Sequence, residues 1–333
     1  MDQSYHSALL EILKGYFQDQ NLHKVESIQT LWSGYGEIAR YNIPTRQRNY
    51  VVKVVNPNSE SAHPRGWNTS ISHLRKLDSY QNEQIFYDSY SGLTDQYSRI
   101  PKCIASGQNQ QIRWLIMEDL DASGFTYRCD DAPLDLVKLG VRWLAYFHAR
   151  FLNNATPELW PIGTYWHLKT RPDEYQKMPE GRLKEAATGL DQQLNSASYQ
   201  TLLHGDAKLA NFCFSAHKDD LAAVDFQYVG RGVGVKDLAY FLGSCFYQDG
   251  LFKHAETLLN DYFSHFKKAL LHYQVNCNFG LLEEQWRVLY PLAWADFERF
   301  LSGWATEHYK RNEYMQKQTE LALAYLNQHK SSS

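Results

Sequence analysis

The 333-residue sequence lacks the marks of a secreted or membrane-spanning protein. Residues 1–6 contain one acid and no Lys or Arg, whereas a secretory signal begins with basic residues followed by an apolar run. The longest nearly apolar stretch, 238–247, is far shorter than the roughly 20 residues that a membrane helix needs. We therefore expect a cytoplasmic protein that has no membrane partner.

Cysteine and metal-binding patterns are also sparse. There are 5 Cys, and the closest two, Cys103 and Cys129, are too far apart for a CxxC pair. The 13 His show no HExxH or similar ligand spacing. These features predict reduced thiols, no disulfide framework and no dedicated zinc site.

Neither sign of charge dominates the sequence. The 34 basic and 37 acidic residues leave a net charge of −3, which argues against a nucleic-acid partner that needs a broadly basic face. Hydrophobic residues make up 44% of the chain, enough for a substantial core. The 9 Trp, 23 Tyr and 16 Phe are expected mainly in that core, because large rings bury much apolar area.

The first third of the chain is rich in predicted strands. An apolar stripe over 4–18 indicates a helix, and a second helix is expected over 72–90. Between them, a polar surface loop is expected at 56–67. Short β-branched or alternating runs, separated by turn residues, predict an antiparallel meander followed by two more strands joined by a turn at 106–111. These strands are expected at 25–32, 37–43, 50–55, 100–104 and 114–117.

After residue 120 the pattern is mainly helical. Helices are expected at 134–152, 181–195, 235–247, 251–274, 281–303 (kinked at Pro291) and 309–328. The exception is 201–227, where a polar loop precedes two short strands. We therefore predict an α+β fold with an N-terminal lobe at 1–117, a hinge at 118–121 and a larger helical lobe at 122–333. Without a low-complexity linker, the lobes are expected to close on a cleft.

The most informative motif is His204-Gly205-Asp206-Ala207-Lys208-Leu209-Ala210-Asn211, followed by Asp225 in an apolar run. Phosphoryl transfer needs a carboxylate that accepts the proton of an attacking hydroxyl, and oxygen ligands for Mg²⁺. Asp206 suits the first role as catalytic base, and Asn211 with Asp225 suits the second. Lys208 would stabilise charge on the transferring group, or would simply pair with a neighbouring carboxylate.

The run 203–211, together with Asp225-Phe226-Gln227, resembles the protein-kinase-like superfamily. Within this superfamily, the sequence is similar to the aminoglycoside phosphotransferase and choline kinase-like family, because Gly205 stands where protein kinases carry Arg. The same run also resembles the ecdysteroid kinase-like subgroup of that family. Gln227 departs from the protein-kinase pattern, which has Gly there. The resemblance implies a bilobal protein-kinase-like fold, with ATP bound between the lobes and Mg²⁺ as cofactor.

The N-terminal part contains further elements of such a site. Gly34 and Gly36 lie between strand-like runs, where they fit either a plain hairpin or a glycine-rich cover for ATP phosphates. Lys53 resembles the kinase lysine that contacts the α- and β-phosphates, although an exposed edge-strand residue is the alternative. The segment around Glu118 to Leu120 resembles the kinase hinge, whose backbone bonds adenine.

A Lys in an apolar strand needs an acidic partner, because an unpaired buried charge is costly. Glu83 is the first candidate, with Asp78 and Asp88 as alternatives. Asp237 resembles the family's acid that orders the catalytic loop, but it also suits the first turn of a helix. His148 resembles a family feature and is expected to be a core histidine.

The acceptor is expected to be a small hydroxylated molecule. Only eleven residues separate Asp225 from Asp237, with no Ala-Pro-Glu sequence, which leaves little room for a peptide-docking segment. An aromatic cluster would form either an acceptor wall or a core stripe; it includes Trp286, Tyr290, Trp294, Phe297 and Trp304. The sequence therefore predicts a small-molecule kinase. The alternative is a nucleotide-binding pseudokinase or regulatory module, and the oligomeric state is not indicated.

Overall fold

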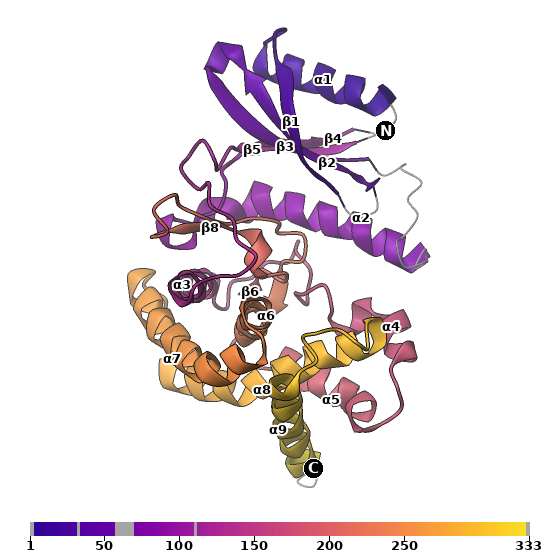
Figure 1. Ribbon diagram of the computed structural model, residues 1–333, viewed down its shortest axis with the longest axis vertical. Coiled ribbons are helices and arrows are strands. Elements are labelled where there is room, and N and C mark those ends of the chain that lie inside the picture. Colours follow the sequence, from indigo (N-terminus) through magenta and orange to yellow (C-terminus); the bar gives the residue numbers. More distant parts are fainter. Residues whose placement is uncertain (1–2, 32–33, 57–69, 110–111, 331–333) are drawn as a thin grey trace. The chain divides into compact units, whose positions relative to one another are not determined.

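The computed structural model describes residues 3–31, 34–56, 70–109 and 112–330 (Figure 1). The chain divides into two compact units. The first comprises Met1–Gly92 and Ile100–Thr126, and the second comprises Leu93–Arg99 and Tyr127–Ser333. Apart from Asn56, the polar loop expected at 56–67 lies outside the described residues.

The first unit contains a five-stranded antiparallel sheet in the order β1-β2-β3-β5-β4. Its strands are β1 His23–Thr30, β2 Gly36–Ile43, β3 Arg48–Val55, β4 Cys103–Gln108 and β5 Arg113–Glu118. The first three form the expected meander. The turn expected at 106–111 was placed too early, because Ser106 to Gln108 pair with β5 and extend β4.

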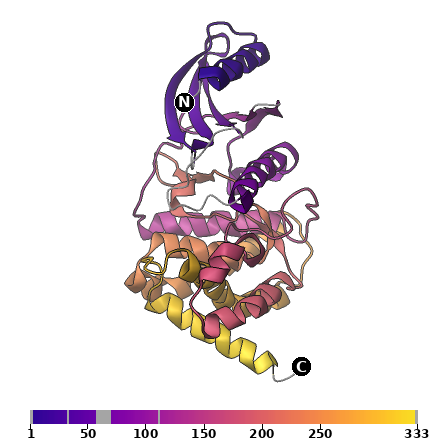
Figure 2. The same cartoon turned by 90° about the vertical axis from the view of Figure 1, so that its right-hand side faces the viewer.

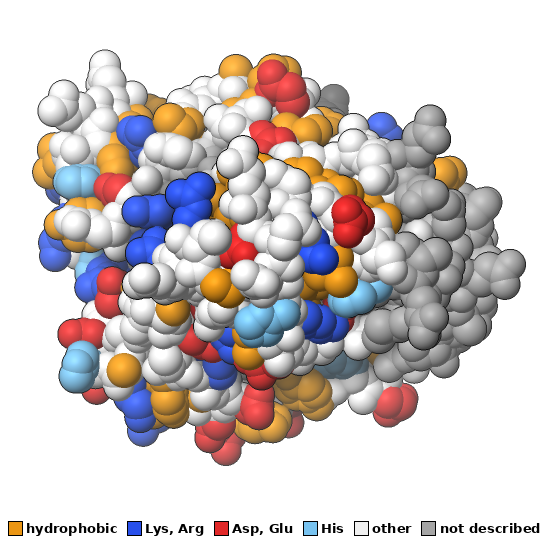
Figure 3. Space-filling view, turned by 90° about the horizontal axis from the view of Figure 1, so that it is seen from above, with side chains coloured by type: hydrophobic (Ala, Val, Ile, Leu, Met, Phe, Trp, Pro, Cys, Tyr) orange, Lys and Arg blue, Asp and Glu red, His pale blue; other side chains and the backbone are white. Residues whose placement is uncertain are grey.

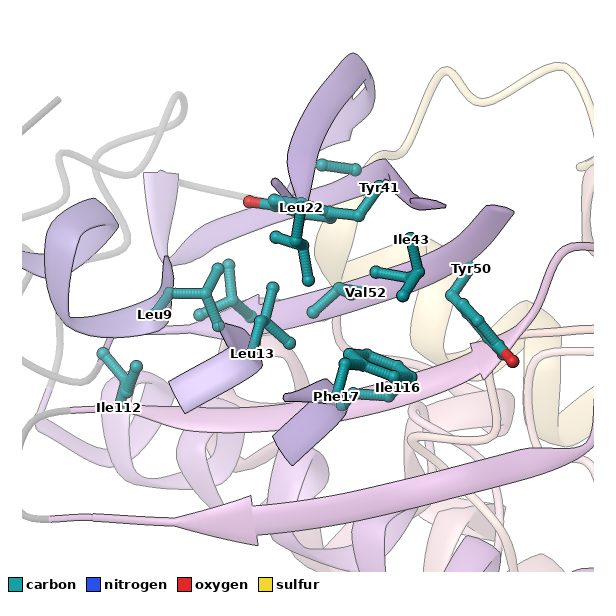
Figure 4. Close-up of a cluster of buried hydrophobic side chains, with 12 residues drawn as sticks. Leu9, Leu13, Phe17, Leu22, Tyr41, Ile43, Tyr50, Val52, Ile112 and Ile116 are labelled. Atoms are coloured by element: carbon teal, nitrogen blue, oxygen red, sulfur yellow. The ribbon is translucent and has the colours of Figure 1, made fainter. Parts of the chain in front are cut away.

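Helix α1, Gln3–Phe17, covers one face of this sheet (Figures 1 and 4). Leu9, Leu13 and Phe17 recur every four residues, so they lie on one side of the helix. They belong to a buried cluster with Val52 and Ile116 of the sheet. The helical stripe in the sequence therefore marks the surface that α1 buries.

The opposite face of the sheet packs against α2, Ser70–Ile85, which continues into a π-helical turn, Phe86–Tyr90. Successive strand residues point to opposite faces, and Val52 and Val54 of β3 lie in the α1 cluster. Lys53 therefore points away from α1, on the same side as Val55, which packs with Tyr80 of α2.

The second unit is mainly helical (Figure 2). Its helices are α3 Leu134–Arg150, α4 Pro172–Lys177, α5 Arg182–Asn195, α6 Val235–Cys245, α7 Gln248–His272, α8 Phe279–Trp304 and α9 Glu313–Lys330. The six-residue α4 was missed because it is too short to show a period. Helix α9, expected from 309, begins at Glu313. In Figure 2, α9 is the yellow helix on the outer side of this unit.

Two short antiparallel strand pairs interrupt the helices of the second unit. β6, Thr201–Leu203, pairs with β9, Gly230–Gly232, and β7, Phe212–Phe214, pairs with β8, Leu221–Ala223. The loop 204–211 joins β6 to β7, while 224–229 joins β8 to β9. Because their flanking strands are paired, the loops run beside each other, and Val224 N–H donates to the Asn211 carbonyl at 2.9 Å.

The aromatic cluster of α8 is mostly core. Trp286, Tyr290 and Trp294 are all buried. Trp286 packs against Tyr262 and Phe266, and its indole N–H donates to the Tyr199 carbonyl. These rings therefore stabilise the helical unit.

Surface charge is mixed on the face drawn in Figure 3, where basic and acidic side chains lie among hydrophobic and uncharged ones. Within the described part of the chain, no helix combines the length and apolarity needed to cross a bilayer.

Candidate active site

Asp237 holds the start of the loop 204–211. It lies in the first turn of α6 and is completely buried. One carboxylate oxygen accepts the backbone N–H of His204 at 2.6 Å, and the other accepts that of Gly205 at 3.1 Å. The sequence offered two interpretations of Asp237, an acid in the first turn of a helix and an acid that orders the loop. The two are compatible, because Asp237 lies in the first turn of α6 and also bonds the loop backbone.

Asp237 is supported from behind by two buried side chains. His148 Nε2 lies 3.1 Å from its carboxylate, and His148 Nδ1 lies 2.8 Å from the Tyr262 hydroxyl. If Tyr262 donates to Nδ1, the Nε2 proton points at Asp237. His148 is a core histidine, as expected, and it also helps to orient the loop. Tyr262 gave no sequence signal beyond a helical stripe.

His204 joins the two neighbouring loops through its ring. Its Nδ1 accepts the N–H of Asp206 at 3.3 Å, so its Nε2 must carry the proton that is donated to the Val224 carbonyl at 3.0 Å. Burial lowers the pKa of His204, despite the opposing effect of Asp237, Asp206 and Asp225. A neutral imidazole therefore acts as a fixed structural link.

Gly205 is required by the close approach of these loops. Its φ is +81°, and a Cβ at this position would lie 1.9 Å from the Tyr228 carbonyl oxygen. Any larger residue would combine an unfavourable backbone conformation with a clash against main chain. The glycine between His204 and Asp206 thus allows 204–211 to lie against 224–229.

The Asp206 carboxylate is held by donors on both oxygens. Oδ1 accepts the Tyr240 hydroxyl at 2.9 Å. Oδ2 accepts Lys208 Nζ at 3.1 Å and Asn211 Nδ2 at 3.2 Å. Tyr240 lies one turn after Asp237 on α6 and was missed by sequence reasoning, because its only local signal is an apolar helix.

Lys208 is more accessible than its partner. Its side chain is 39% exposed, against 7% for Asp206. Burial opposes its charge, but Asp206 and Asp225 outweigh that effect and raise the pKa of Lys208. The ion pair matches the alternative interpretation of Lys208, while its role toward a phosphoryl group stays a prediction.

Asn211 and Asp225 lie on the adjoining loops. Asn211 uses Nδ2 for its bonds to Asp206, and its Oδ1 makes no hydrogen bond within the described part of the chain. Asp225 has a left-handed φ of +69°, and its Oδ1 accepts Gln227 Nε2. Gln227, the departure from the protein-kinase pattern, therefore contacts the predicted metal ligand directly.

An amide oxygen and a carboxylate suit Mg²⁺, which usually takes one or two protein ligands and completes its shell with phosphate oxygens and water. The described residues contain no group of three or more His, Cys, Asp or Glu side chains arranged as a metal cluster. The donor set therefore fits Mg²⁺ shared with a nucleotide better than a closed structural metal site.

The first unit contains a buried ion pair. Lys53 Nζ lies 2.7 Å from Glu83 Oε2, and the two side chains are 3% and 2% exposed. Of the three acids considered from the sequence, Glu83 is the one in this pair. Lys53 also lies over the Tyr80 ring, at 5.6 Å from its centroid.

Gly34 and Gly36 lie at the hairpin between β1 and β2. The Leu31 N–H donates to the Gly36 carbonyl at 2.8 Å and closes this turn. Gly36 has a φ of +149°, and a Cβ there would lie 2.0 Å from the Val54 carbonyl oxygen. The close packing explains Gly36 structurally, so a phosphate-covering role stays a prediction. Trp32 and Ser33 lie outside the described residues.

The predicted adenine-binding segment follows β5. Glu118 ends this strand, and its Oε2 accepts the Lys102 N–H at 3.0 Å. The Leu120 carbonyl accepts the N–H of Phe125 at 2.9 Å. The Glu118 N–H donates to the Lys102 carbonyl at 2.9 Å. Adenine binding by the backbone of this segment stays a prediction.

Comparisons with known proteins give one family and several distant structural likenesses. An aminoglycoside phosphotransferase from Streptomyces rimosus is 15% identical, with 88% of this chain and 97% of that chain covered and a TM-score of 0.46. An ethanolamine kinase from Plasmodium vivax is 12% identical, with coverages of 92% and 82% and a TM-score of 0.48. No curated protein matches the sequence.

The family match covers most of the chain and includes predicted site residues of both units. It extends over residues 39–157 and 166–275, which include Lys53, Glu83, Asp206, Asn211 and Asp225. The resemblance predicted from 203–211 and 225–227 is thereby confirmed: the chain belongs to the ecdysteroid kinase-like family, within the protein-kinase-like superfamily.

Proposed function

We propose that this protein transfers the γ-phosphoryl group of ATP to a hydroxyl of a small molecule, with Mg²⁺ as cofactor. The observation that carries the proposal is the Asp206 carboxylate, buried and oriented by Tyr240, Lys208 and Asn211. Membership of a kinase-like family supports the reaction class.

Asp206 would act as the catalytic base. The acceptor oxygen forms a bond to the γ-phosphorus, its proton passes to Asp206, and the bond to the leaving oxygen of ADP breaks. Lys208 would lie near the transferring group and offset its charge. Asn211 Oδ1 and Asp225 would hold Mg²⁺, which neutralises phosphate charge when bound.

The first unit would supply the nucleotide contacts. Lys53, held by Glu83, would bond the α- and β-phosphates, and Gly34 with Gly36 would cover them. The backbone from Glu118 to Leu120 would bond adenine. The Lys53–Glu83 ion pair supports this assignment, because it holds the lysine ammonium in a defined position.

A small acceptor fits the segment after Asp225 better than a protein acceptor. Gly230–Gly232 form β9 and Val235 begins α6, so regular structure takes up much of the interval before Asp237. Little chain is left for a peptide-docking segment. The alternative is a nucleotide-binding pseudokinase. A pseudokinase usually lacks one of these groups, whereas this sequence contains all of them.

Asp206→Asn tests this proposal, with the exposed Asp130→Asn as the matched control. Hydroxylated compounds (amino alcohols, sugars, aminoglycosides and sterols) would be screened for ATP consumption and product formation, alongside Mg·ATP binding by calorimetry. We expect Asp206→Asn to bind nucleotide but lose roughly 100-fold or more in transfer rate. Transfer at the Asp130→Asn rate would exclude Asp206 as base. Nucleotide binding without transfer by the wild type would favour the pseudokinase.

A further inference from the structure

Lys310 is a buried lysine next to the Asp206 site. It lies in the connection 305–312 between α8 and α9, and only 9% of its surface is exposed. Its Nζ lies 4.8 Å from the centroid of the Tyr240 ring and 5.8 Å from that of Phe297. A lysine enclosed by aromatic rings is an unusual burial for a charged group.

No acidic partner in the described ranges 3–31, 34–56, 70–109 and 112–330 accounts for this burial. Within the described residues, no carboxylate lies at ion-pair distance from Lys310 Nζ, and no hydrogen bond from Nζ is formed. Attraction to the faces of Tyr240 and Phe297 offsets part of the desolvation cost. All three donors of the ammonium nevertheless remain available to a ligand.

Tyr240 links this ammonium to the predicted base. Lys310 Nζ lies over one face of the Tyr240 ring, and the Tyr240 hydroxyl donates to Asp206 Oδ1 at 2.9 Å. Lys310 is therefore one aromatic ring away from the carboxylate at which an acceptor hydroxyl would react. Burial lowers the pKa of Lys310 to about 8, although Asp206 opposes this effect. At neutral pH the side chain is still mostly charged.

We propose that Lys310 is a specificity-determining residue of the acceptor site, which excludes cationic acceptors and donates a hydrogen bond to an oxygen of an uncharged or anionic one. The inference rests on the proposed function, because it takes Asp206 as the position of the reacting hydroxyl. The faces of Tyr240 and Phe297 are where an amine would be held by cation–π attraction. Here the protein's own cation occupies them.

A second cation in this position would meet like-charge repulsion in a partly desolvated site, where charges interact more strongly than in water. An oxygen acceptor, in contrast, would complete the hydrogen bonding of Lys310. The geometry therefore favours acceptors whose group next to the reacting hydroxyl is a hydroxyl, carbonyl or carboxylate.

The test compares choline with its uncharged isostere, 3,3-dimethylbutan-1-ol, by calorimetric binding to the full chain. Wild type is compared with Lys310→Met, and the exposed Lys253→Met is the matched control. We expect choline to bind Lys310→Met at least tenfold more tightly than it binds the other two proteins, with no such gain for the isostere. Choline affinities that agree within twofold, or an equal gain for the isostere, would overturn the proposal.

A second measurement needs no variant, should Lys310→Met fail to fold. Raising the pH from 6.5 to 9.5 removes most of the Lys310 charge, so choline should bind wild type more tightly by about tenfold. The titratable groups that face Lys310, and whose charge could also change with pH, are Tyr240, Cys245, Tyr309, Lys208 and Asp206. The pKa values of the first four are raised, so those groups keep their protons over this range. An affinity unchanged by pH would contradict the role of Lys310.

Both measurements record binding and not turnover. If Asp206→Asn shows that the proposed transfer is wrong, the choline comparison still reports whether the Lys310 charge excludes cations. If transfer is established and choline affinity does not respond to Lys310, only the specificity assignment fails.

Discussion

Replacing either member of the buried Lys53–Glu83 ion pair should loosen the first unit strongly, while replacing both should cost less than either single change. The two charged atoms are 2.7 Å apart, and both side chains are almost fully enclosed. Lys53→Met leaves the Glu83 carboxylate without its ammonium, and Glu83→Met leaves the Lys53 ammonium without its carboxylate. The double variant has neither charge and keeps similar side-chain volume.

Each single change should lower the free energy of unfolding of this unit by about 3–5 kcal/mol, because it leaves one buried charge without the opposite charge of this ion pair. The double variant avoids that charge and should lie nearer to the wild type. Hydrogen exchange of the β3 and α2 amides measures the opening of this unit directly. At 1.4 kcal/mol per factor of ten, each single variant should exchange there roughly 10²- to 10⁴-fold faster.

The exposed pair Arg182–Glu320 provides the control. Its atoms are 3.0 Å apart, close to the separation in the buried pair, but its side chains are 63% and 62% exposed. Arg182→Met should therefore cost less than about 1 kcal/mol, measured on α5 amides. If Lys53→Met exchanged within threefold of wild type, or if the double variant exchanged faster than both singles, the burial argument would be refuted.

Two further changes probe the second unit. Asp237→Asn should lower the free energy of unfolding by about 1–3 kcal/mol and slow any ATP-dependent transfer, because one loop N–H or the His148 N–H loses its acceptor. Unfolding by denaturant and the rate of turnover would be compared with those of Asp130→Asn. Equal values in the two variants would argue against this role of Asp237. Burial, reinforced by Lys236, lowers the pKa of His167 to about 3, so the unfolded chain gains a proton below pH 6.5 that the folded chain resists, and stability falls as the pH drops. His167→Gln should remove up to about 1.4 kcal/mol of that loss per pH unit between 6.5 and 3. The free energy of unfolding of both proteins would be measured at pH 7, 5.5 and 4. An equal decrease with pH in the two proteins would contradict this prediction.

Features encoded by neighbouring residues were predictable from the sequence. The stripe of α1, the meander β1–β3 and the placement of Lys53 in an apolar strand all follow from local periodicity. The position of Glu83 on the next helix made it a candidate, but Asp78 and Asp88 shared the same local pattern. Only the way α2 packs on the sheet distinguishes them.

The rest of the site depends on contacts between distant parts of the chain. Tyr240, Tyr262 and Lys310 lie on or beside helices whose local pattern indicates only core packing. Their relation to the loop 204–211 arises when α6, α7 and the connection after α8 come together. For Trp286 and Trp294 the sequence left two interpretations open, an acceptor wall and a core stripe, because a buried stripe and a ligand-facing stripe have the same period. Both side chains are buried in the structure.

Helix α6 helps to orient the predicted base, together with Lys208 and Asn211 of the loop itself. Asp237 and Tyr240 are three residues apart, so they lie on one side of the helix, where the first bonds the loop backbone and the second bonds the Asp206 carboxylate. The neighbouring Lys236 is buried and pairs with Asp296 of α8 at 3.2 Å. A change that shifts α6 against α8 would therefore move the loop and the carboxylate together, so catalytic geometry should depend on packing in the helical core.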